Sequence, residues 1–192
     1  MKEQKPESTL SLAILGLIAQ RPLSGYDLRK TFATTPMGHF SSSPGAIYPA
    51  LKRLGERGLV DGKTEGADTL RPKRVFRLTE SGVEALRREL SRPITADDVI
   101  WNVEALVLRF AFMDHALGRE AALEFLQAFH ARMTEYLPTL ETTRQELEDE
   151  GRTHAAVAVL HGVEQYAAHI RWATAAIQTL STDSDTPSTE NV

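Results

Sequence analysis

The sequence has no cysteine and no apolar run of the length that spans a bilayer. The lack of thiols excludes disulfides and thiolate zinc sites. The main apolar stretch, residues 10–19, is too short for a transmembrane helix, and no signal cleavage pattern accompanies it. The 192 residues, 42% of them hydrophobic and 25% charged, are typical of a globular protein of one or two domains. We therefore expect a globular protein of the cytoplasm.

Catalytic motifs are absent as well. The sequence contains no glycine-rich phosphate loop, no nucleophile elbow and no HExxH zinc motif. His154, His161 and His169 fall on one expected helix, but a spacing of seven residues separates side chains by ~10.5 Å, which is too far to share a metal ion. We interpret them as solvated or interface histidines. The sequence thus predicts neither an enzyme nor a protein that binds a metal or another cofactor.

The two halves of the chain differ in charge. Residues 1–92 hold 16 Lys and Arg against 10 Asp and Glu, a net charge of +6, whereas residues 93–192 hold 6 against 16, a net charge of −10. A basic half can bind the phosphates of nucleic acid, whereas an acidic half is repelled by them. The asymmetry indicates either a nucleic-acid-binding half or a chance partition of surface charge.

The basic half is predicted to form three helices, two strands and a further helix. Caps and periodicity predict helices over residues 9–20, 24–32, 43–57 and 79–90, and strands over 59–64 and 73–78. Thr9 is the expected cap of the first helix, and Ser24 with Asp27 has the spacing of a capping box. We expect Pro49 to kink the third helix. The candidates for apolar contacts from the second helix are Tyr26, Leu28 and Phe32.

Beyond Pro93 every expected element is a helix. Helices are predicted over residues 99–113, 119–149 and 152–180, and Pro138 is expected to interrupt the second of them. Residues 183–192 are polar and are expected to be disordered. The predicted domains are therefore residues 1–92 and a helical domain of residues 93–182. Because about 90 residues can hardly bury such large apolar helical faces alone, we expect a two-fold dimer that forms through this second domain.

Three helices followed by a two-stranded ribbon are the plan of a winged helix-turn-helix domain, so the fold class is mainly α with a small wing. Such a domain directs its third helix to the major groove and a basic wing to the DNA backbone. The third helix here begins with hydroxyls and continues with a tyrosine and cations, and further cations lie at the wing. The predicted DNA-contacting residues are Ser41, Ser42, Ser43, Tyr48, Lys52, Arg53, Arg71, Lys73 and Arg74.

These motifs resemble those of PadR-type transcriptional regulators. The third-helix signature of that family is similar to Ser43-x-Gly45-x-Ile47-Tyr48-Pro49-x-Leu51-x-x-Leu54-x-x-x-Gly58-Leu59. The start of its second helix resembles Leu23-Ser24-Gly25-Tyr26-Asp27-Leu28, and its wing resembles Lys73-Arg74-x-Phe76-x-Leu78-Thr79-x-x-Gly82. Gly55 and Phe76 depart from the family, which usually has Glu and Tyr there. The second half is similar in length to that of the longer subgroup, whose C-terminal part is described as virulence-activator-like.

The resemblance implies a homodimer that represses its own or a neighbouring promoter and is often released by a small molecule such as a phenolic acid. A two-fold dimer would present two recognition helices to a palindromic operator in double-stranded DNA. The alternative is a protein-interaction adaptor that retains a winged helix without binding DNA. The wing cations Arg71, Lys73 and Arg74 argue against the adaptor, which would not need to neutralise phosphates.

Several residue roles stay open at this point. Tyr48 is either a hydroxyl that contacts phosphate or an aromatic residue of the core. Lys52 contacts either a base edge or a phosphate. Trp101, Phe110 and Met113 either line a pocket for an aromatic effector or pack in the core or the dimer interface, since stacking and packing use the same side chains.

Overall fold

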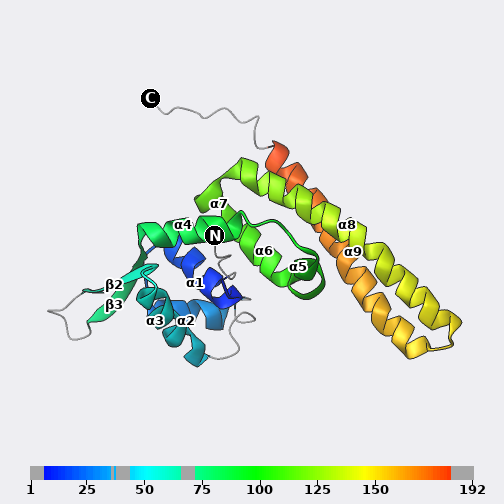
Figure 1. Ribbon diagram of the computed structural model, residues 1–192, viewed down its shortest axis with the longest axis horizontal. Helices are drawn as coiled ribbons and strands as arrows, with labels where there is room; N and C mark the ends of the chain where they lie inside the picture. The colour runs from blue at the N-terminus through cyan, green and yellow to red at the C-terminus, as the bar shows by residue number, and fades with distance from the viewer. Residues whose placement is uncertain (1–6, 36, 38–43, 66–71, 183–192) are drawn as a thin grey trace, which may run out of the picture. The chain divides into compact units, whose positions relative to one another are not determined.

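The computed structural model describes residues 7–35, 37, 44–65 and 72–182, and its chain divides into two compact units (Figure 1). The first consists of Met1–Arg92 and Val107–Gly118, and the second of Pro93–Leu106 and Arg119–Val192. This division differs from the predicted boundary after residue 92, which placed residues 107–118 in the second domain. They belong to the first unit because α7 (Met113–Leu117) packs against α1 (Thr9–Gln20) and α4 (Glu80–Leu90). The predicted tail, residues 183–192, lies outside the described residues.

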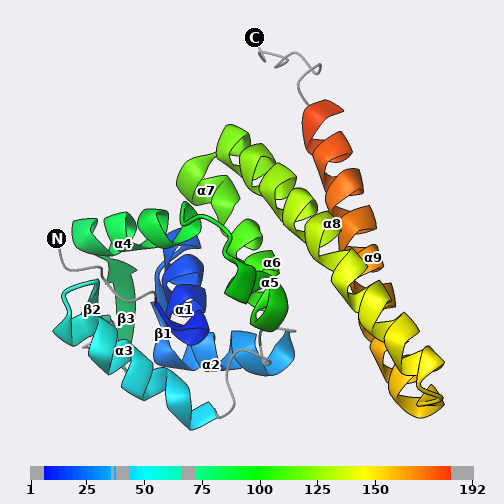
Figure 2. The same ribbon diagram turned by 45° about the vertical axis from the view of Figure 1, so that its right-hand side comes forward.

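The first unit confirms the predicted order of helices and strands. After α1 come α2 (Gly25–Thr34), a 3-10 turn (Pro44–Ala46), α3 (Ile47–Glu56), β2 (Val60–Glu65), β3 (Lys73–Leu78) and α4. α1 lies at the centre of the unit, in contact with α3, α4 and β3 (Figure 2). It is buried from Ser11 to Ile18. The nearly continuous apolar sequence of this helix is explained by this burial on all sides.

The described strands of this unit form an antiparallel sheet in the order β1-β3-β2. β2 and β3 form the wing, in which Val60 lies opposite Leu78 and Glu65 opposite Lys73. β1 (Leu23–Ser24) pairs with β3 and thereby ties the wing to the start of α2. Sequence reasoning missed β1 because two residues are too few to show an alternating pattern.

Side-chain caps determine where helices of this unit begin. Ser8, rather than the expected Thr9, caps α1, since its hydroxyl accepts a hydrogen bond from the Ser11 amide at 3.2 Å. Thr79 caps α4 by accepting from the Gly82 amide at 3.0 Å. Gly82 has a further role, because a Cβ at that position would collide with the backbone of the residue that precedes β2.

Two expectations concern Pro49 of α3 and Tyr26 of α2. Pro49, expected to kink the third helix, is the third residue of α3, where a backbone amide has no acceptor within the helix, so it removes no hydrogen bond from α3. Tyr26 is not a core residue, since its side chain is 59% exposed. Leu28 and Phe32, the other two candidates, do occupy the buried face of α2.

The helix predicted over residues 99–113 is broken into three. They are α5 (Ala96–Trp101), α6 (Val103–Ala111) and α7. Asn102 separates the first two, because its backbone has left the helical conformation, with φ −138° and ψ 32°. Phe112 separates α6 from α7. Its buried ring lies against Gly16 of α1, and a side chain at position 16 would overlap that ring. Tertiary packing of one aromatic ring thus outweighs the helical periodicity of this segment.

In the second unit, α8 (Arg119–Asp149) and α9 (Thr153–Thr182) form a long antiparallel hairpin (Figures 1 and 2). Gly151 makes the turn with a φ of 73°, a conformation that favours glycine. The expected interruption at Pro138 does not occur, because α8 continues through it. Pairing with α9 along the helix compensates for the lost backbone hydrogen bond.

Aromatic side chains fill the hairpin. Phe129 is fully buried, and Trp172 and His169 meet its ring edge-on, with centroids at 5.4 and 6.0 Å. The Tyr166 hydroxyl donates to the Val99 carbonyl at 2.5 Å and so attaches α5 to α9. No helix in the described ranges is both long and apolar enough to cross a membrane.

Candidate nucleic-acid interface

One face of α3 is buried in the first unit and the other is exposed. Ile47, Leu51 and Leu54, with Ala50, are buried against the rest of the first unit, as the predicted apolar stripe requires. Tyr48 and Lys52 lie one turn apart on the other side and are exposed. The buried stripe therefore fixes the direction in which α3 presents its tyrosine and its lysine.

Tyr48 rests on the beginning of α2. Its ring lies so close to Gly25 that a Cβ at that position would come within 2.6 Å of Tyr48 Cε1. The side chain is 54% exposed, so the core alternative does not describe its place in the fold. Because Gly25 has no side chain, the Tyr48 ring can lie against the backbone of α2. More than half of Tyr48 nevertheless stays exposed and can contact a ligand.

Lys52 has an acidic neighbour on the same helix. Its Nζ lies 3.8 Å from Glu56 Oε1, and both side chains are largely exposed, so this pair contributes little stability and exchanges readily for another partner. Arg53 is exposed and forms no ion pair with any residue that the structure describes. Arg57, the next cation, is already engaged, because it donates to the Glu7 carboxylate at 2.8 Å and makes a second bond to it.

The wing holds Arg74 in a defined position. The Nε of Arg74 donates to the Gly62 carbonyl at 3.3 Å, and the guanidinium carbon lies 5.4 Å from the centroid of the Phe76 ring. Arg77, also on β3, is neutralised by Glu65 at 3.2 Å. Among the described cations of β3, Arg74 is therefore the one that has a hydrogen bond to the backbone and a ring contact but no carboxylate partner.

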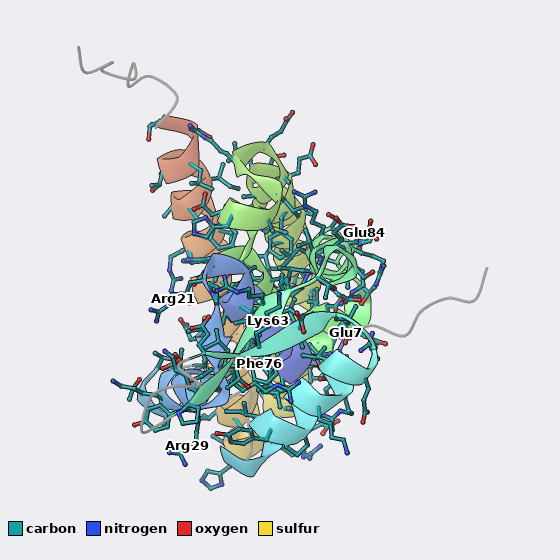
Figure 3. The ribbon with its side chains drawn as sticks, turned by 90° about the vertical axis from the view of Figure 1, so that its left-hand side faces the viewer. Glu7, Arg21, Arg29, Lys63, Phe76 and Glu84 are labelled. Atoms are coloured by element: carbon teal, nitrogen blue, oxygen red, sulfur yellow. The ribbon has the colours of Figure 1, made fainter. Side chains whose placement is uncertain are left out.

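The start of α2 carries a complete capping box. The Ser24 amide and hydroxyl both donate to Asp27 Oδ2, at 3.0 and 2.7 Å, and the Asp27 amide donates back to the Ser24 hydroxyl at 3.2 Å. The hydrogen bonds from Ser24 hold the pKa of the Asp27 carboxyl below its ordinary value of 3.8, and the nearby charges of Lys73 and Arg21 add to this effect. Near the same capping box, the side chains of Arg21 and Arg29 extend outward from the first unit (Figure 3).

A cavity of about 820 Å³ lies between α3, the start of α2 and the wing. Four of the predicted DNA-contacting residues line it together: Tyr48, Lys52, Lys73 and Arg74. We call this set the interface cluster. Glu56 and Asp61 line the same cavity and contribute negative charge, so the cavity is not uniformly basic. Hydroxyl, ammonium and guanidinium donors on one concave surface suit a polyanion whose phosphates attract cations and whose base edges accept hydrogen bonds.

The remaining predicted site residues have other positions. Ser41, Ser42, Ser43 and Arg71 lie outside the described residues, and Arg53 does not line the cavity. Of the effector candidates, Trp101 belongs to the second unit and is 76% exposed, whereas Phe110 and Met113 belong to the first. Met113 is only 2% exposed and packs in the core of its unit. The structure thus does not bring the three together within one unit.

Sequence reasoning missed the residues that position the interface cluster. Gly25 and Gly62 make room for Tyr48 and Arg74, and Phe76 lies beneath the Arg74 guanidinium. Tyr26 is also exposed at this cavity, with the Arg29 guanidinium 5.4 Å from its ring centroid. The signal was present for Gly62 alone, as a glycine inside a predicted strand, which often marks a close approach. Within the described ranges, no three His, Asp or Glu side chains gather in a way that could hold a metal ion.

Comparison with known proteins identifies the family. The model of the transcriptional regulator PadR-like family matches residues 14–88, and that of the virulence activator alpha C-terminal domain matches residues 104–181. The negative transcriptional regulator PadR of Bacillus subtilis is 31% identical over 135 residues, which are 65% of this chain and 74% of that protein.

Two crystal structures of Bacillus subtilis PadR are also similar. The complex with operator DNA has a TM-score of 0.43 at 24% identity and covers 89% of this chain and 98% of that one. The complex with p-coumaric acid has a TM-score of 0.39 at 22% identity and covers 93% and 98%. On the strength of the sequence matches, this chain belongs to the PadR-like family of transcriptional regulators.

Proposed function

We propose that this regulator is a repressor that binds a specific operator in double-stranded DNA through the interface cluster. The observation that carries the proposal is that Tyr48 and Lys52 of α3 line one cavity with Lys73 and Arg74 of the wing. A recognition helix and a wing that face the same concave surface can contact base edges and the flanking phosphates together. The role is regulatory rather than catalytic, and it is exercised in the cytoplasm.

We propose further that the repressor acts as a homodimer through its second unit. Large apolar side chains are exposed there: Val157 is 59%, Leu160 40% and Trp101 76% exposed. Val157 and Leu160 lie three residues apart on α9, so their exposed side chains are neighbours on one side of that helix. Exposed apolar surface of this kind is typical of an interface between protomers, and a two-fold dimer would present two α3 helices to a palindrome.

We also propose release from DNA by a small aromatic effector, to which Trp101 would contribute a stacking surface. Support comes from the exposure of this indole and from the crystal structure of Bacillus subtilis PadR in complex with p-coumaric acid. Met113 is not included, because its burial assigns it to packing. Phe110 is half-buried in the first unit, so it is a separate candidate for an aromatic contact and not part of a site with Trp101.

Hydroxyl-radical footprinting of DNA from the upstream region of the gene tests the DNA-binding proposal. We expect two protected half-sites, related by an inverted repeat and separated by one helical turn, ~34–36 Å. Footprints that appear equally on a scrambled fragment, or that do not appear, would refute an operator-specific repressor. A single protected half-site would refute the dimer alone.

A further inference from the structure

The wing of this protein contains a small assembly of three residues around one arginine. Gly62 on β2 lies directly opposite Phe76 on β3, and Arg74 lies two residues before Phe76 on the same strand. Because side chains alternate along a strand, Arg74 and Phe76 share one face of the wing. This face borders the cavity that also holds Tyr48 and Lys52 of α3.

Gly62 makes room for the arginine. A Cβ at this position would lie 2.5 Å from Arg74 Nε and 2.9 Å from Phe76 Cε1, both of which are too close for ordinary contacts. The absence of a side chain lets Arg74 lie flat across the partner strand and donate from Nε to the Gly62 carbonyl at 3.3 Å. A larger residue at position 62 would displace both neighbours.

Phe76 supplies the surface on which the guanidinium rests. The guanidinium carbon lies 5.4 Å from the ring centroid, within the range of a cation–π contact. The ring itself is half-buried and sits where β3 also pairs with β1, with Leu23 opposite Phe76, so the backbone beneath it is fixed on both sides. The Nε of Arg74 thus has an acceptor and its guanidinium has a ring contact, while among the described residues no carboxylate pairs with this side chain at the cavity.

We propose that Gly62 and Phe76 are positioning residues, which hold the Arg74 guanidinium towards α3 so that it meets DNA phosphate in a fixed register with the recognition helix. This rests on the proposed DNA-binding function. A long side chain that is ordered before binding loses less conformational freedom when it binds. Arginine suits this arrangement because one N–H can hold the side chain while the others bind a phosphate.

A second wing cation provides a matched control. Lys63 lies on β2 beside Gly62, and Figure 3 shows it on the wing together with Phe76. Its side chain is exposed, and it has neither an ion pair nor a ring contact among the described residues. Removing Lys63 takes one charge from the wing without disturbing any positioning contact.

A double-mutant cycle on operator binding tests the proposal in the full-length protein. We expect Phe76→Leu to weaken binding roughly two- to ten-fold in the wild-type background, the cost of ordering one long side chain. In the Arg74→Ala background the same change should cause no further loss, because the residue acts through Arg74. Phe76→Tyr keeps the ring face and should bind as the wild type does. Lys63→Ala should add to Phe76→Leu independently.

Several outcomes would overturn the proposal. Equal losses from Phe76→Leu with and without Arg74 would make Phe76 a structural residue only, and a loss in Phe76→Tyr would point to the packing of the ring rather than its face. If the wild type does not bind the operator, the proposed function fails, and the positioning role in DNA binding fails with it.

A measurement without DNA separates these failures. The Nε proton of Arg74, observed by NMR in the free full-length protein, should exchange with water more slowly than that of the exposed Arg53. This protection should be lost in Gly62→Ala and in Phe76→Leu, and kept in Phe76→Tyr. Fast exchange of the Arg74 proton in the wild type would overturn the positioning claim, whatever the protein binds.

Discussion

Glycine positions decide which side chains this protein can present at its candidate interface. Gly25 lies beneath the Tyr48 ring and Gly62 beneath Arg74, and in both places a Cβ would collide with the functional side chain. Neither glycine has the positive φ that otherwise explains glycine in a turn, which in the described residues occurs at Gly58, Gly118 and Gly151. The two glycines are therefore explained by close approach rather than by backbone conformation.

The Tyr48 hydroxyl is predicted to contact DNA. Since the side chain is 54% exposed, Tyr48→Phe should leave the thermal stability unchanged. It should weaken operator binding by about 1.5–3 kcal/mol if the hydroxyl donates to a phosphate. Fluorescence anisotropy titration with labelled operator measures this change. Wild-type affinity in Tyr48→Phe would show instead that the ring matters only for its packing on Gly25.

Glu56 is predicted to weaken DNA binding, because it lines the interface cavity and pairs with Lys52. Glu56→Gln removes a charge that repels phosphate and frees the lysine, so affinity for operator and for random DNA should rise, by about 0.2–1 kcal/mol at low salt. The control is Glu84→Gln, which changes the net charge equally at an exposed position of α4 that does not line the cavity (Figure 3). An equal gain in the control would assign the effect to net charge alone.

At the scale of an element, the capping box of α2 makes that helix sensitive to acid. The pKa of Asp27 is lower in the folded state, so between the folded and unfolded pKa values the unfolded chain binds more protons. The stabilisation by Asp27 is complete above its unfolded value, near 3.8, and is lost as the pH falls through the folded pKa. The protection factors of the α2 amides, which compare their hydrogen-exchange rates with those of the unfolded chain at the same pH, should therefore fall below that pH.

Asp27→Asn serves as the comparison for this effect. The substitution removes a negative charge from the first turn and should destabilise α2 by about 0.3–1 kcal/mol at neutral pH, and the difference from the wild type should vanish in acid. A difference that is the same at both pH values would show that the carboxylate charge does not support the cap.

Element boundaries show what the sequence could predict. Short-range signals succeeded, since the capping box of Ser24 with Asp27 and the start of α4 near Thr79 depend only on neighbouring residues. Tertiary contacts decided the failures: Phe112 breaks a periodic helix because Gly16 of α1 accepts its ring, and α8 continues through Pro138 because α9 pairs with it. For the candidate site, the motif predicted Tyr48, Lys52, Lys73 and Arg74. The supporting contacts of Gly25 and Phe76 could not be predicted, because they join separate elements.

At the scale of the whole molecule, exposed apolar residues on α9 predict a dimer. The double variant Val157→Glu with Leu160→Glu places charges on the proposed interface and should convert the protein to a monomer, which light scattering after size-exclusion chromatography detects. The double variant Gln165→Glu with Gln178→Glu adds the same two charges at other exposed positions of α9; it is the matched control and should remain dimeric. A wild type that is monomeric at micromolar concentration would contradict the prediction.

The central claim is that this chain binds operator DNA through cations of α3 and the wing, and the salt dependence of binding tests it most directly. Affinity for the upstream fragment and for a scrambled fragment of equal length is measured over a series of salt concentrations. Lys52, Lys73 and Arg74 can each neutralise one phosphate, so a dimer would neutralise about six. A plot of the logarithm of the binding constant against the logarithm of the salt concentration should then have a slope of about −5. The upstream fragment should bind more tightly throughout. A slope near zero, or equal affinity for both fragments, would contradict the account.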